Sequence, residues 1–130
     1  MPSSPSFVLI RAPTYLTIAG AQHGQGAVIT RDRHGPVDAH RQTFTQTAPC
    51  VQTNIDSNSD DPSQDVFMSI RRRNLARLLL HDINPDTATY TEYWRLLQLH
   101  PLRNDLTVYT VIMCPAFDVF EIRLPTYRLP

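Results

Sequence analysis

The stretch from Ser69 to His100 constrains the fold more than any other part of the chain, because apolar periodicity, helix capping and a helix breaker agree there. It predicts two short helices joined by a turn at Asn84-Pro85. The second helix is expected to open with a capping box, in which Thr89 is followed by Glu92 three residues later. We therefore expect the rest of the fold to assemble on this helix pair.

Both helices show an amphipathic pattern at helical spacing. The apolar face of the first helix consists of Met68, Leu75, Ala76, Leu78 and Leu79. Its opposite, cationic face consists of Arg73, Arg77 and His81. In the second helix the shared face consists of Tyr90, Tyr93, Trp94 and Leu97. Aromatic residues at this spacing are more typical of a core than of a base-stacking platform, so we expect this face to be buried.

Segments rich in β-branched and aromatic residues flank the helix pair on both sides. Four strands are expected before it, at 6–11, 14–20, 27–33 and 41–47, and two after it, at 106–114 and 119–124. The order β-β-β-β-α-α-β-β predicts one α+β domain over residues 1–130, mainly an antiparallel sheet covered on one face by the helices. Both faces of 106–114 are apolar, so this strand is expected to be central and to pair with 119–124.

The segment 53–65 has almost nothing to bury and is rich in acidic and small polar residues, so a mobile loop is expected there. Over the whole sequence, 12 basic residues balance 12 acidic ones, and no global field favours nucleic acid or an anionic membrane. Cys50 and Cys114 lie far apart and are expected to be free thiols. Without a secretory signal or an apolar run of membrane-spanning length, the chain is expected to be soluble and intracellular, in the cytoplasm.

All 12 basic residues are arginine and none is lysine. Lysine is ordinarily among the commonest residues, so chance explains this poorly. Lysine codons are nearly all adenine, whereas the commonest residue types here have codons rich in cytosine, which favours nucleotide bias in the coding strand. Such bias is typical of a cytosine-rich genome, or of a frame overprinted on another gene as in small viral accessory proteins. Selection against lysine modification, or accident, is the alternative.

A cluster of arginines opens the first helix and is the strongest candidate binding site. Its members are Arg71, Arg72, Arg73 and Arg77. Cations in the first turn oppose the helix macrodipole, and like charges four residues apart repel, so an anionic ligand such as RNA would relieve both costs. The alternative is that Asp60, Asp61 and Asp65, which lie just upstream, fold over the helix terminus and neutralise it.

A second constellation, Asp32, His34, Asp38 and His40, contains residue types that bind zinc, manganese or iron, or that act as a general base with its orienting group. Its spacing matches no specific metal or catalytic signature. We therefore predict no metal, no cofactor and no catalytic residue from it, and keep a small metal-dependent hydrolase built on 32–40 as a distant alternative.

Neutral charge, a polar edge strand at 41–47 and the lack of a catalytic signature favour a protein that is not an enzyme. The leading interpretation is a protein-interaction module, such as a viral or phage accessory or structural protein, which forms a homodimer or binds another protein. The alternative is an RNA-binding protein that uses the arginine-rich helix 69–82.

Overall fold

The computed structural model describes residues 14–22, 25–32, 35–40, 49–55 and 59–125. Within these ranges the strands and α-helices are β1 (Thr14–Ala19), β2 (Gly26–Asp32), β3 (Gly35–His40), α1 (Ser69–His81), α2 (Tyr90–Leu97), β4 (Thr110–Cys114) and β5 (Val119–Arg123). Short 3-10 turns occupy Pro62–Gln64, Val66–Met68 and Pro115–Phe117. The predicted α+β class and the order of strands, helix pair and strand hairpin are confirmed.

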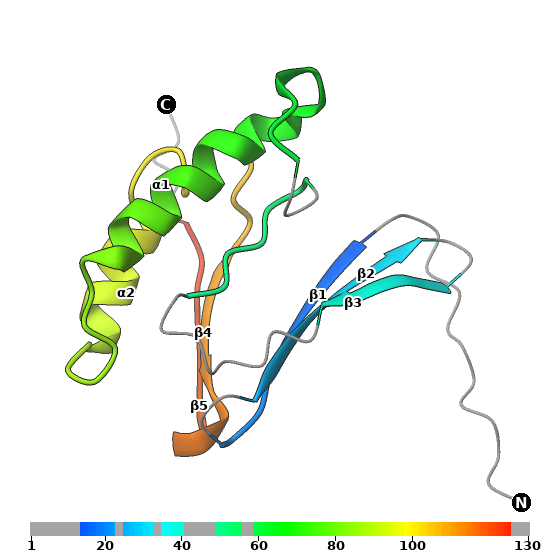
Figure 1. Cartoon of the computed structure of the whole chain (residues 1–130). Helices are drawn as coiled ribbons and strands as arrows, with labels where there is room; N and C mark the ends of the chain where they lie inside the picture. The colour runs from blue at the N-terminus through cyan, green and yellow to red at the C-terminus, as the bar shows by residue number, and fades with distance from the viewer. Residues whose placement is uncertain (1–13, 23–24, 33–34, 41–48, 56–58, 126–130) are drawn as a thin grey trace, which may run out of the picture.

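The described strands form two antiparallel sheets, β1-β2-β3 and β4-β5. Figure 1 shows the helices on one side of the β4-β5 hairpin and the three-stranded sheet on its other side. The expected arrangement, one sheet covered on one face by the helices, thus applies to the hairpin, while the three-stranded sheet stands apart. The division into domains stays a prediction.

The strand β3 was not expected, because the sequence of Gly35–His40 has a weak strand pattern. It pairs with β2 from Val28 opposite His40 to Asp32 opposite Gly35, and the register shifts between Thr30 and Arg31. Proline lacks an N–H donor and is tolerated at bulges and sheet edges, which is where Pro36 lies. The strands expected at 6–11 and 41–47 lie outside the described residues.

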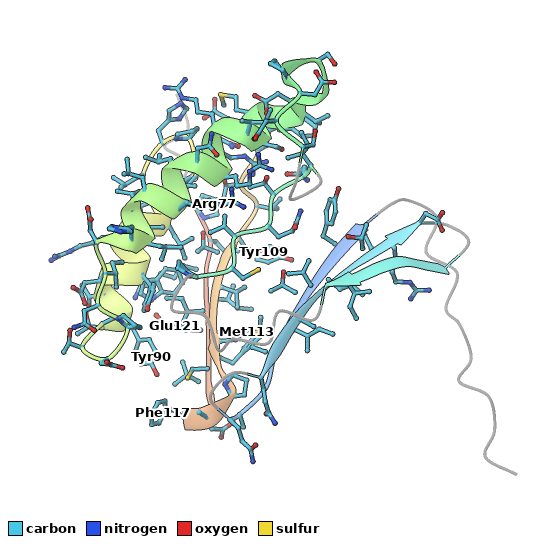
Figure 2. The ribbon with its side chains drawn as sticks, viewed as in Figure 1. Arg77, Tyr90, Tyr109, Met113, Phe117 and Glu121 are labelled. Carbon is cyan, nitrogen blue, oxygen red and sulfur yellow. The ribbon has the colours of Figure 1, made fainter. Side chains whose placement is uncertain are left out.

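The strand β4 pairs with β5 as predicted, and the hairpin turns at Pro115–Phe117; within the described residues β4 has no second partner strand, so its expected central position is not seen there. Its side chains are correspondingly accessible: Met113 is 63% exposed and Phe117, in the turn, is 76% exposed. Figure 2 labels both at the turn end of the hairpin.

The buried residues lie mainly on the helices and on the segment that crosses α1. They are Val28, Ile55, Ser69, Arg73, Ala76, Trp94, Leu96 and Pro101. Trp94 is 4% exposed, and the Arg123 guanidinium lies 4.1 Å from its ring centroid, which joins α2 to β5. No helix in the described residues has both the length and the apolar character needed to cross a bilayer.

The faces expected for α1 are wrong in two places. Arg73, assigned to the solvated face, is buried, and Leu78, assigned to the apolar face, is 64% exposed. The buried stripe of α1 runs through Ser69, Arg73 and Ala76, which share one side of a helix at this spacing. This stripe follows the segment packed across α1 and not the side with the most apolar residues.

The capping box of α2 is confirmed, and it makes the stability of the helix N-terminus depend on pH. The Glu92 carboxylate accepts hydrogen bonds from the Thr89 backbone N–H at 2.6 Å and from the Thr89 hydroxyl at 2.9 Å. These bonds, the backbone one first, hold the pKa of Glu92 below its ordinary value.

A carboxyl whose pKa is lowered by folding stabilises the fold above its unfolded pKa, and this contribution is lost as the pH falls through the folded pKa. We expect Glu92→Gln to lower the melting temperature at neutral pH, and the two proteins to converge in strong acid. Thermal unfolding followed by circular dichroism across this pH range measures the effect. An unchanged melting temperature at neutral pH would contradict it.

Candidate active site

The candidate site lies where residues 52–55 cross the first turn of α1. The Thr53 hydroxyl donates to the Ser69 carbonyl oxygen at 3.1 Å, and Arg72 Nη2 donates to Asn54 Oδ1 at 2.5 Å. The same Nη2 donates to the Ser69 hydroxyl at 3.1 Å. We call Asn54, Ser69 and Arg72 the donor cluster.

Arg72 is the centre of this donor cluster. Burial lowers the pKa of its guanidinium, and the nearby Asp65 carboxylate opposes that effect. Asp65 itself accepts a hydrogen bond from the Ile70 backbone N–H at 2.8 Å, which satisfies one of the free N–H groups at the start of α1. Arg72 Nε is buried and has no hydrogen-bond partner within the described residues. A buried donor of this kind calls for a partner such as water or a ligand.

Asn54 presents its amide to the outside of the donor cluster. Because Oδ1 accepts from Arg72, the amide orientation is fixed and the NH₂ group remains as a donor. Asn54 is exposed, so a ligand can reach it. An amide NH₂ beside a guanidinium is suited to bind a carbonyl oxygen or to stabilise negative charge that develops on it.

The four predicted site arginines do not form one surface. Arg73 is 1% exposed and donates to the Ser59 carbonyl oxygen at 2.7 Å and to the Asp60 carboxylate. Arg71 and Arg77 are exposed, and Arg77 is labelled in Figure 2. Neutralisation of this helix end by upstream acidic residues is thus confirmed for Asp60 with Arg73. Binding of an external anion by the four arginines together stays a prediction.

Little in the sequence indicated which residues of the crossing segment contact α1. Ile55 is 4% exposed, and the Gln52 side-chain amide donates to the carbonyl oxygens of Thr53 and Ile55, at 2.8 Å each. The one available signal was the change from polar residues to Ile55 at the start of the acidic segment. Residues 53–55 and 59–65 are bonded to α1 or lie at its start, so the described ends of this segment belong to the site.

The histidine and aspartate constellation is only partly described. Asp32 ends β2, His34 lies outside the described residues, and Asp38 and His40 lie on β3, whose side chains are not described. In the described part of the chain no three His, Cys, Asp or Glu residues gather as a metal site would need.

No family model matches the chain. It is similar to acid ceramidase from several mammals. The cynomolgus macaque (Macaca fascicularis) protein is 32% identical over 113 residues, which are 86% of this chain and 27% of the relative. The bovine (Bos taurus) protein is 32% identical over 124 residues, and the human protein 32% over 119 residues, in each case 91% of this chain and 28% of the relative. The chain thus spans just over a quarter of the length of these relatives.

These similarities correct the functional interpretation of the sequence. The non-enzymatic interaction module, the viral accessory protein and the RNA-binding use of helix 69–82 are wrong, because the relatives are hydrolases. A homodimer receives no support, and a cytoplasmic location stays a prediction. The arginine cluster misled the sequence interpretation because two of its members are bonded inside the fold, Arg73 to Asp60 and Arg72 to Asn54. Over most of its length, this chain is similar to about a quarter of acid ceramidase.

Proposed function

We propose that this chain hydrolyses ceramide and that its donor cluster polarises the substrate amide. One observation carries the proposal: Arg72 Nη2 donates to Asn54 Oδ1 at 2.5 Å, which fixes the Asn54 amide and leaves its NH₂ group as a donor on an exposed residue beside a guanidinium. The similarity to acid ceramidase over 86–91% of the chain supports the choice of substrate.

Ceramide joins a fatty acid to a long-chain amino alcohol through a secondary amide. Its hydrolysis breaks the C–N bond and adds one water, which yields a carboxylic acid and a free amine. Attack on the carbonyl carbon moves negative charge onto the carbonyl oxygen, and fixed N–H donors stabilise this charge more than they stabilise the neutral amide. Arg72 adds a permanent positive charge, and Asn54 adds a neutral donor of fixed orientation.

The nucleophile is not assigned to Cys50, although a cysteine near an arginine is a common nucleophile. Burial raises the pKa of the Cys50 thiol, and the electrostatic effect of Arg77 lowers it by less. A thiol with a raised pKa is mostly protonated near neutrality and is therefore a poor nucleophile. The role proposed for the described residues is therefore to stabilise the oxyanion.

The direct test is hydrolysis of a fluorescent short-chain ceramide by the purified chain, with the released fatty acid separated by chromatography. The matched control is the same preparation after irreversible heat unfolding. Release by the native chain well above the unfolded control supports the proposal. Equal release from the two preparations, between acidic and neutral pH, overturns it.

A further inference from the structure

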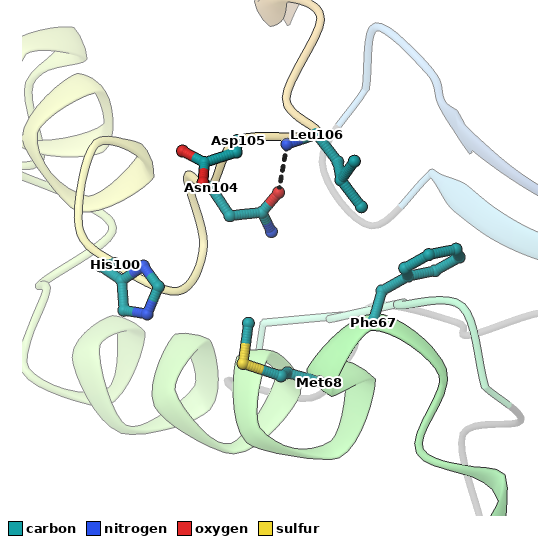
Figure 3. A pocket seen from close by; sticks show the side chains of 6 residues that line it. All are labelled: Phe67, Met68, His100, Asn104, Asp105 and Leu106. Atoms are coloured by element: carbon teal, nitrogen blue, oxygen red, sulfur yellow. Dashed lines mark hydrogen bonds between the residues drawn. The ribbon is translucent and has the colours of Figure 1, made fainter.

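A pocket of about 300 Å³ opens beside the start of α1, one residue from the donor cluster. Its lining residues are Phe67, Met68, His100, Asn104, Asp105 and Leu106. Figure 3 shows Phe67 and Met68 extending from the start of α1 toward the loop that carries the other four. One wall is thus largely apolar and the other largely polar.

The apolar wall is held in an unusual backbone conformation. Phe67 has φ 54° and Met68 has φ 58°, both in the left-handed region, which non-glycine residues rarely adopt. Burial of these side chains does not compensate for the strain, because Phe67 is 57% exposed and Met68 is 36% exposed. Residues held in such sparsely populated backbone conformations cluster at active sites and ligand-binding sites.

The polar wall contains one fixed residue and two accessible ones. Asn104 Oδ1 accepts from the Leu106 backbone N–H at 2.9 Å, and Asn104 Nδ2 donates to the Pro101 carbonyl oxygen at 3.3 Å, so Asn104 fixes the loop. His100 and Asp105 are exposed. An imidazole can donate or accept a hydrogen bond and a carboxylate can accept one, so this wall is suited to hydroxyl groups.

We infer that this pocket binds the part of ceramide next to the amide, with an alkyl segment against Phe67, Met68 and Leu106 and a hydroxyl toward His100 or Asp105. This inference rests on the proposed function. Met68, which lines the pocket, directly precedes Ser69 of the donor cluster, so the two are adjacent along the chain. A pocket of about 300 Å³ is at the small end of ligand sites, so it holds a segment of the lipid and not a whole chain.

The test is the binding of fluorescent short-chain ceramide, measured by fluorescence anisotropy, to the wild type, Phe67→Gly and Leu78→Ala. Glycine adopts the left-handed conformation freely, so Phe67→Gly should leave the melting temperature unchanged or raise it. The same change should weaken binding about tenfold, because it removes a large apolar contact. Leu78 is 64% exposed on α1 and does not line the pocket, so Leu78→Ala should bind like the wild type.

A second variant, Leu106→Ser, removes the apolar group from the facing loop and should also weaken binding. If Phe67→Gly and Leu106→Ser both bind as tightly as the wild type, the pocket inference is overturned, whatever the hydrolysis assay shows. If binding depends on both residues but the wild type releases no fatty acid, the pocket stands as a ceramide site and the hydrolase proposal fails.

Discussion

Trp94→Ala is expected to lower the free energy of unfolding by about 3–5 kcal/mol, the usual cost of truncating a large aromatic side chain in a core. Trp94 is 4% exposed, and its ring carries the Arg123 guanidinium at 4.1 Å. The substitution therefore removes core contacts and also the cation–π contact that joins α2 to β5. Urea denaturation followed by circular dichroism measures the change.

The matched control for this variant is Leu99→Ala, just beyond α2, where the side chain is 46% exposed. Its expected cost is well below that of Trp94→Ala, because a half-exposed leucine leaves only a shallow gap. Equal costs for the two variants would show that Trp94 is not part of the core. Trp94→Phe, which keeps a ring in the core, should fall between the two.

If the chain hydrolyses ceramide as proposed, Arg72→Gln is expected to reduce kcat by about 10²–10³, the range found when one donor to an oxyanion is removed. The fall should be in kcat more than in KM, since charge on the carbonyl oxygen develops only in the transition state. Arg72→Lys should not restore the rate, because a compact ammonium lacks the planar guanidinium, whose Nη2 binds both Asn54 and the Ser69 hydroxyl while its other N–H groups remain donors.

The control is Arg71→Gln, which removes the same charge from the neighbouring exposed position. If loss of positive charge alone explains the effect, both variants should lose activity equally. If the donor cluster is responsible, Arg71→Gln should keep most of the wild-type rate. Circular dichroism of both variants separates a local effect on kcat from a loss of folded protein.

Local signals predicted the elements that depend on neighbouring residues. The first helix was expected over 69–82 and spans Ser69–His81, and the Thr89 and Glu92 capping box forms as expected. A capping box or a helical stripe is determined within a few residues, so it can be identified from sequence. The strand β3 escaped notice because its pairing with β2 outweighs its own weak strand pattern.

The contacts of the candidate site could not be predicted in the same way. Arg73 is bonded to Asp60, and Arg72 to Asn54, across 13 and 18 residues of chain. Helical periodicity assigns an arginine to solvent, since a charged side chain is rarely buried without a partner. These partners lie on a segment with no regular pattern. The arginine run therefore indicated an anion-binding surface, although two of its members are hydrogen-bonded to other parts of the chain.

The donor cluster has a consequence for how this molecule responds to acid. A guanidinium keeps its proton throughout the pH range of a folded protein, and an asparagine amide has no proton to gain or lose there. The contact between Arg72 and Asn54 therefore has the same charge and the same donors in acid as at neutrality. If the rate of hydrolysis passes through a pH optimum, its fall on either side therefore reports the ionisation of the attacking and leaving groups, because the protonation of these two donors does not change.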